Sequence, residues 1–74
     1  MNTFKTRWTN ENGGEWFGDP AGYATIDDAW VTAQTYFDDP ECVDDIVQVW
    51  EVDEDGEIVG VTAVEEYSAD DFTK

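Results

Sequence analysis

The feature that most constrains the fold is a valine-rich stretch in the second half of the chain, because it has the pattern of a β-hairpin. Two runs rich in Val and Ile, Ile46–Val52 and Glu57–Val64, flank the acidic segment Asp53–Gly56. β-Branched side chains favour the pleated surface of a strand. Asp at the first turn position and Gly at the fourth predict a type I turn, with Gly56 in the left-handed conformation of a bulge.

This turn fixes the register of the predicted hairpin, because side chains alternate between the two faces of a strand. It places Asp53 opposite Glu57 and then pairs the apolar residues of the two runs. The expected pairs are Glu51 with Val59, Val49 with Val61 and Val47 with Ala63. A two-residue turn at Asp55–Gly56 would divide the apolar patch that these pairs form, so the bulged register is preferred.

A helix is predicted from about Ile26 to Phe37. Thr25 is a suitable N-cap, and acidic residues in the first turn favour the positive end of the helix dipole. Apolar side chains recur on one stripe of this helix. They are Ile26, Ala29, Trp30, Ala33 and Phe37. We expect this stripe to cover the valine face of the hairpin, with Trp30 and Phe37 in the core.

The first residues complete the predicted sheet. Thr3–Thr9 alternates as a strand does, and Glu15–Phe17 follows turn residues and is predicted to form a short return strand. The chain is therefore predicted to be one small α+β domain, residues 1–74. Its expected fold is a βαββ-type antiparallel sheet of three to four strands with one helix packed on one face. We expect the first strand to pair with the last one, Glu57–Val64.

The second face of the predicted sheet also carries apolar residues, and such a face is too apolar to lie bare in water. These residues are Ile46, Trp50, Val52, Ile58 and Val64. Either the segment Trp8–Phe17 folds over this face, or a second copy of the chain does. The pattern favours cover from within the chain and leaves a homodimer as the alternative.

Charge is the unusual property of the composition. Nineteen Asp and Glu stand against three Lys and Arg, which gives a net charge of −16. A compact chain of this length is about 29 Å across, and about 29 Å of duplex DNA carries about 17 phosphate charges. Repulsion among like charges costs folding free energy, and solubility needs a net charge of only about 2–8. The charge therefore indicates either a basic partner or adaptation to molar salt.

The sequence carries no sign of catalysis or of a bound cofactor. It has no His and no Gly-rich phosphate loop. The segment Glu51–Ile58 partly matches a calcium-binding EF-hand loop, but Thr62 stands where a bidentate Glu is needed, so no metal site is predicted. A single Cys42, with no leader and no long apolar run, predicts a cytoplasmic protein without a membrane partner.

An acidic surface can instead imitate nucleic acid. Alternate carboxylates on a strand lie about 6.6 Å apart, which is comparable to the spacing of successive phosphates. The Lys and Arg side chains of a DNA-binding protein would pair with such carboxylates as they pair with phosphate, and the chain itself would not bind nucleic acid directly. Acidic residues are most closely spaced at the hairpin turn and at the end of the helix. The predicted partner-binding residues are Asp38, Asp39, Asp44, Asp45, Glu51, Asp53, Glu54, Asp55 and Glu57.

Short length, extreme acidity, scattered Trp and a βαββ layout resemble the small phage-encoded inhibitors that imitate DNA, in particular anti-CRISPR proteins. The resemblance covers the whole chain and rests on composition and layout. It implies a non-catalytic inhibitor, in the cytoplasm of a phage-infected host, that occupies the basic DNA-binding groove of a nucleic-acid-binding complex. That complex would in the first place be a CRISPR–Cas effector such as a type I Cascade. A restriction enzyme, a repair nuclease or a histone-like protein could be blocked in the same way. The alternative is a salt-adapted (halophilic) small accessory domain with no such role.

Overall fold

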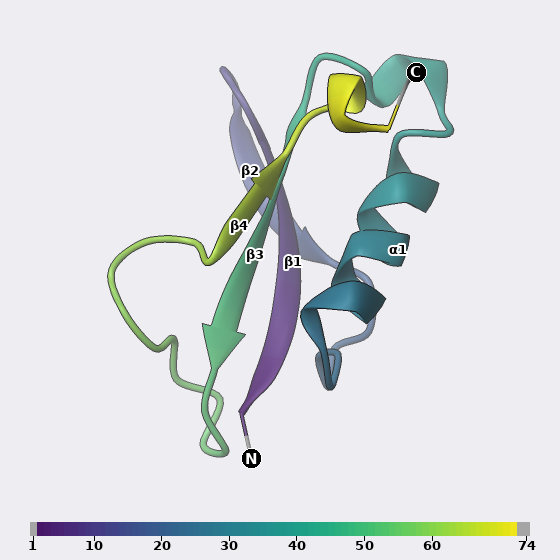
Figure 1. Cartoon of the computed structure of the whole chain (residues 1–74). Coiled ribbons are helices and arrows are strands. Elements are labelled where there is room, and N and C mark those ends of the chain that lie inside the picture. Colours follow the sequence, from purple (N-terminus) through teal and green to yellow (C-terminus); the bar gives the residue numbers. More distant parts are fainter. Residues whose placement is uncertain (1, 73–74) are drawn as a thin grey trace.

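The computed structural model describes residues 2–72 and has the element order ββαββ, which confirms the α+β fold class (Figure 1). The chain forms one four-stranded antiparallel sheet in the order β2-β1-β3-β4, and one helix packs against it. The strands are β1 (Thr3–Asn10), β2 (Gly13–Phe17), β3 (Ile46–Val52) and β4 (Glu65–Tyr67). The helix is α1 (Ile26–Tyr36), and two short 3₁₀ turns are η1 (Pro40–Cys42) and η2 (Ala69–Asp71).

Strand β1 lies inside the sheet and pairs with both β2 and β3. The expected pairing of the first strand with the last one is therefore wrong. The reason lies in strand length, because β4 has only three residues whereas β1 has eight and β3 has seven. Pairing the two longest strands with each other satisfies the most backbone hydrogen-bonding groups.

The turn between β3 and the following residues has the predicted form. Gly56 has a φ of +86°, and its N–H donates to the carbonyl of Asp53 at 3.1 Å. The N–H of Asp53 donates to the carbonyl of Glu57, and the N–H of Val59 donates to the carbonyl of Glu51, both at 2.9 Å. The bulged register is therefore confirmed at the hairpin end.

The ladder breaks directly after Val59, so the expected pairs of Val49 with Val61 and of Val47 with Ala63 are wrong. Gly60 has a φ of +88° and turns the chain away from β3. The chain then loops out before it returns to the sheet (Figure 1). Glycine inside an apparent strand often marks such a departure, because it adopts a positive φ without steric cost.

The residues that return to β3 form β4. Glu65 lies opposite Val49 and Tyr67 lies opposite Val47. The ring of Tyr67 contacts that of Phe72, with 5.7 Å between the ring centroids. An aromatic side chain buries far more apolar area than Ala63 would, which accounts for the displaced register.

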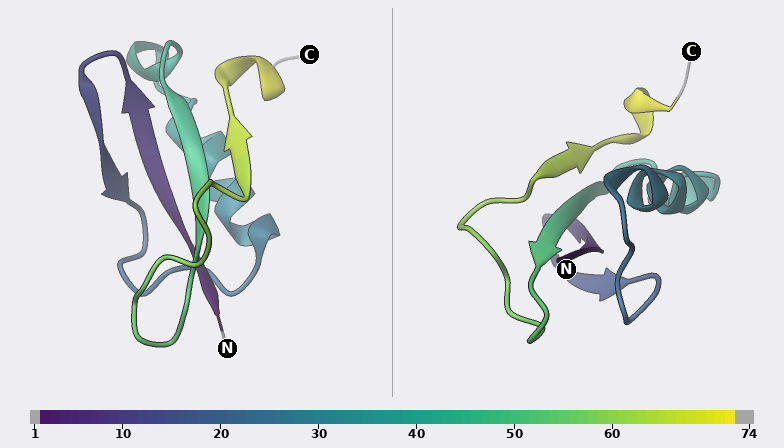
Figure 2. Two further views of the ribbon diagram at one scale, coloured as in Figure 1. Left: turned by 90° about the vertical axis from the view of Figure 1, so that its left-hand side faces the viewer. Right: turned by 60° about the horizontal axis from the view of Figure 1, so that its bottom comes forward.

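The core lies between α1 and the face of the sheet that carries Thr6, Val47 and Val49 (Figure 2). These three side chains, together with Ala29 and Ala33 of α1, are fully buried. The small alanines let the helix come close to the valines, as dense packing requires. The buried hydroxyl of Thr6 donates to the carbonyl of Phe17 at 2.8 Å, so no polar group is left unsatisfied there.

The helix begins where the sequence predicts and ends one residue earlier. The hydroxyl of Thr25 accepts a hydrogen bond from the N–H of Asp28 at 3.2 Å, which confirms Thr25 as the N-cap. Phe37 is the C-cap rather than the last helical residue. Within residues 2–72 no helix is long and apolar enough to span a lipid bilayer.

Trp30 was expected in the core, and this prediction is wrong, because 38% of its surface is exposed. Its ring packs at 5.2 Å from Phe72, which also contacts Phe37 at 5.7 Å. The end of the described chain therefore folds back over the outer edge of α1. Phe37 is half-buried in this aromatic cluster.

The segment Trp8–Phe17 does not cover the second face of the sheet, so this expectation is also wrong. A tight turn at residues 11–12 pairs β2 edge to edge with β1, and the hairpin extends the sheet instead of folding over it. In the left view of Figure 2, no helix or strand of the described residues crosses this face. We call it the open face; it carries Lys5, Arg7, Trp16, Gln48, Trp50 and Glu66.

Candidate acidic interface

The structure divides the predicted partner-binding residues between the two ends of β3. Asp44 and Asp45 directly precede this strand and Asp53 directly follows it. At about 3.3 Å per residue, Asp45 and Asp53 are about 26 Å apart. The helix-end cluster consists of Asp38, Asp39, Glu41, Asp44 and Asp45. The turn cluster consists of Glu51, Asp53, Glu54, Asp55 and Glu57.

The helix-end cluster is built where α1, η1 and the start of β3 meet (Figure 1). Asp39 caps η1, because its carboxylate accepts from the N–H of Glu41 at 2.9 Å. Asp45 accepts from Asn10 Nδ2 at 3.0 Å and from Tyr36 Oη at 2.5 Å. The contacts of Asp45 tie the cluster to the end of β1 and to the last turn of α1, so the carboxylates of Asp39 and Asp45 are held in place.

A shallow hollow of about 500 Å³ opens beside this cluster. It is lined by Asn10, Glu11, Asn12, Glu41, Asp44 and Asp45. Four carboxylates therefore face one concave surface, which suits an entering Lys or Arg side chain. The sequence-based prediction missed Glu11 and Glu41. Pairing β1 with the start of β3 would have revealed Glu11, since Thr9 lies opposite Ile46 and brings the β1–β2 turn beside Asp44.

Tyr36 is the residue that links the helix-end cluster to the core. Burial, together with the hydrogen bond to the carboxylate of Asp45, raises the pKa of the Tyr36 phenol well above its usual value. Its ring stacks on Phe17 with 4.9 Å between centroids. The phenol therefore stays protonated as the donor to Asp45 at neutral pH.

The turn cluster is organised by Asp53. Its Oδ1 atom accepts hydrogen bonds from the N–H groups of Asp55 and Glu57, both at 2.9 Å. Such a local bond from an Asp side chain to the backbone stabilises a turn. Glu51 accepts from Asn2 Nδ2 at 2.6 Å. Asp53 is thus a structural residue of the turn, whereas Asp55 and Glu57 are exposed.

Several carboxylates remain available to a partner. Within residues 2–72, no hydrogen bond or ion pair engages the carboxylates of Asp38, Asp44, Asp55 or Glu57. In the same part of the chain, no three Cys, Asp or Glu residues are placed to hold a metal ion together. The chemistry that this arrangement supports is pairing with cationic side chains at two separate ends of the molecule.

Of the two described cations, Arg7 lies near the middle of β3, whereas Lys5 lines a hollow together with Asp53, Glu54 and Asp55 of the turn cluster. Lys5 pairs with Trp50 across the sheet and Arg7 with Gln48, which puts both on the open face. No ion pair joins either of them to a carboxylate among the described residues. Ten of the nineteen carboxylates therefore belong to the two clusters at the ends of β3, and Arg7 lies between these clusters on the open face.

No protein-family model, curated protein or solved structure matches this chain.

Proposed function

We propose that the protein is a non-catalytic inhibitor that acts as a DNA mimic. Its two acidic clusters would occupy the basic DNA-binding groove of a nucleic-acid-binding complex, in the first place a CRISPR–Cas effector such as a type I Cascade, in the host cytoplasm. The observation that carries this proposal is the concentration of ten of the nineteen carboxylates in two clusters, at the two ends of β3 about 26 Å apart. Salt adaptation alone requires only an acidic surface and no such concentration.

The size of the molecule supports the same conclusion. Its longest dimension is 35 Å. A duplex of that length carries about 20 phosphate charges, which is close to the net charge of −16. A groove that accepts duplex DNA therefore meets a similar amount of negative charge over a similar length.

The free carboxylates supply the chemistry of binding. Asp38 and Asp44 at one end, and Asp55 and Glu57 at the other, can each accept charge-assisted hydrogen bonds from Lys or Arg. Long-range attraction would also speed the encounter with a basic groove, and added salt would weaken it. We therefore expect the affinity for the partner complex to fall as the salt concentration rises.

The test is affinity capture from the lysate of a bacterium that carries a type I CRISPR system, with the full chain as bait at low salt. We expect a DNA-binding complex to be retained and to be released by added duplex DNA. Retention of no DNA-binding protein, together with unfolding below about 0.1 M salt, would favour the salt-adapted alternative.

Matched variants locate the contact. Asp55→Asn with Glu57→Gln, and separately Asp38→Asn with Asp44→Asn, should weaken capture. Glu15→Gln with Glu65→Gln removes the same charge from exposed strand positions and should leave capture nearly unchanged. Equal effects of all three pairs would mean that only net charge matters, and would contradict the two-cluster site.

A further inference from the structure

The open face has a defined row of side chains that crosses all four strands. Arg7 lies opposite Trp16 on one side and opposite Gln48 on the other, and Gln48 lies opposite Glu66. The row therefore runs Trp16, Arg7, Gln48, Glu66 from β2 to β4. A cation and a carboxylate stand on either side of Gln48, one strand away from it in each direction.

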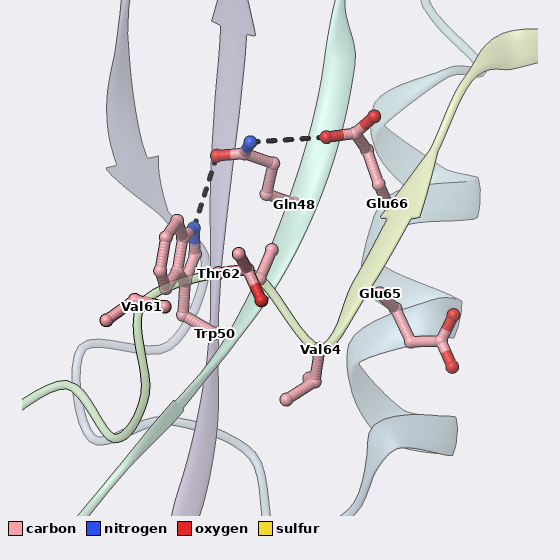
Figure 3. Close-up of a pocket in the computed structure, with 8 residues that line it drawn as sticks. Gln48, Trp50, Val61, Thr62, Val64, Glu65 and Glu66 are labelled. Carbon is pink, nitrogen blue, oxygen red and sulfur yellow. Dashed lines mark hydrogen bonds between the residues drawn. The ribbon is translucent and has the colours of Figure 1, made fainter.

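The aromatic side chains on this face are held in place. Trp50 Nε1 donates to Gln48 Oε1 at 3.2 Å, and Gln48 Nε2 donates to Glu66 Oε2 at 3.3 Å (Figure 3). Trp16 packs edge-on against Trp50 with 6.4 Å between the ring centroids, and 46% of its surface is exposed. A preorganised aromatic surface costs little conformational entropy when it is covered.

The exposed apolar surface continues beside this row, because the loop between β3 and β4 leaves large aliphatic side chains in solvent. Val61 is 93% exposed and lies with Trp50 at the edge of a hollow of about 510 Å³ (Figure 3). Val64 lines the same hollow and is 39% exposed. An apolar surface of this kind marks an interaction site.

The charges on the open face identify what can cover it. Lys5 and Arg7 are the only positively charged side chains among residues 2–72, and both face this side without a carboxylate partner in that range. An occupant must therefore bring apolar surface and a carboxylate. A nucleic acid is a poor occupant, since a chain with a net charge of −16 repels a polyanion.

We propose that the open face binds a second copy of this chain, with the two sheets packed face to face around a two-fold axis parallel to β3. An axis over β3 places Gln48 and Trp50 against their counterparts. Because Arg7 and Glu66 are each one strand from β3 on opposite sides, the same rotation places Arg7 of each copy opposite Glu66 of the other. The face is thus complementary to itself in charge, as a symmetric interface requires.

The area of the face sets the strength of this dimer. The four strands hold 23 residues in all, so about 3.3 Å per residue and about 4.8 Å between strands give a flat area of about 360 Å². A stable interface buries about 800 Å² per partner, so the loop with Val61 must add surface and the dimer is weak and reversible. Two copies also bring together two charges of −16, so screening by salt should strengthen the association.

The test is sedimentation equilibrium of the full chain, at protein concentrations from about 10 µM to about 1 mM and at about 0.05 M and 0.5 M NaCl. We expect a monomer–dimer equilibrium that is tighter at the higher salt. Arg7→Glu and Glu66→Arg should each weaken dimerisation by about tenfold, and the double charge swap should restore it. Glu65→Arg changes net charge as Glu66→Arg does but lies on the other face, so it should not weaken the dimer.

A chain that stays monomeric over both ranges would overturn the proposal, as would a double swap that fails to recover the dimer although circular dichroism shows it folded. If Arg7→Glu weakened capture of a DNA-binding complex while the parent chain stayed monomeric, the face would dock that complex and not a second copy. The inference is independent of the proposed inhibitor function, because salt should weaken partner capture and strengthen the dimer.

Discussion

At the scale of single residues, neighbouring carboxylates in this chain have different roles. Asp45 and Asp53 accept hydrogen bonds that hold the fold together, whereas the side chains of Asp44 and Asp55 project without such a bond in the described structure. The sequence predicted all four as binding residues. It could not separate them, because the role of Asp45 depends on Asn10 and Tyr36, which only the folded chain brings close.

Tyr36→Phe should lower the free energy of unfolding by about 1–2 kcal/mol at neutral pH, because it removes the hydrogen bond to the charged Asp45. The pKa of Tyr36 is raised in the folded state, so the folded chain keeps a proton that the unfolded chain releases above about pH 10. The stability of the parent chain should therefore fall as pH rises above that value. Urea titrations should show a shallower fall for Tyr36→Phe; equal slopes would contradict this role.

Asp53→Ala and Asp55→Ala form a matched pair within the turn cluster. Loss of the Asp53 carboxylate removes two backbone contacts and should cost about 1–2 kcal/mol of stability. Asp55→Ala should change stability by less than about 0.5 kcal/mol, as exposed substitutions do. Urea midpoints distinguish the two, and a similar loss in both would show that Asp53 has no special part in the turn.

At the scale of elements, the sequence correctly predicted the features that depend only on neighbouring residues. The turn that ends in Gly56 and the cap at Thr25 follow from side chains a few residues away, and both are present. The register beyond Gly60 was missed, because it depends on whether Tyr67 or Ala63 packs over Val47. That choice is made by distant aromatic contacts, so alternation within the strand cannot decide it.

The contact between α1 and the sheet offers a direct test of the core. Ala33 is fully buried and Gln34 beside it is exposed. Ala33→Leu should destabilise the fold by about 1–3 kcal/mol through overpacking, whereas Gln34→Leu should change stability by less than about 0.5 kcal/mol. Thermal unfolding followed by circular dichroism measures both changes in stability. If Ala33→Leu left the stability unchanged, the helix would not lie tightly on the valine face.

At the scale of the whole molecule, composition predicted that charge matters but not where it gathers. The nine predicted residues fall into two groups because β3 separates Asp45 from Asp53, and the β1–β2 turn adds Glu11 to one of them. The separation follows from β3 itself, which the sequence predicted as a strand, whereas the addition of Glu11 depends on the pairing of β1 with β3, which the sequence did not predict. A second apolar face that includes Trp50 was predicted, but its preferred cover by Trp8–Phe17 is wrong, because β2 pairs with β1 in the plane of the sheet.

The stability of the fold at low salt depends on the net charge of the whole molecule. If the charge serves a partner, the chain should remain folded at about 20 mM salt despite weak screening, and molar salt should add only a modest increase in stability. Circular dichroism and urea titration at both salt concentrations check this. Loss of the folded signal at low salt would instead indicate a protein adapted to brine.

The most direct measurement of the central claim is a competition titration on the complex that the chain captures. Labelled duplex DNA is bound to that complex, and its release is followed as unlabelled chain is added at several fixed concentrations of DNA. Occupation of one groove predicts mutually exclusive binding, so the apparent dissociation constant of the chain should rise in proportion to the concentration of duplex. A ternary complex that holds both the chain and the duplex, with no change in that constant, would contradict the account.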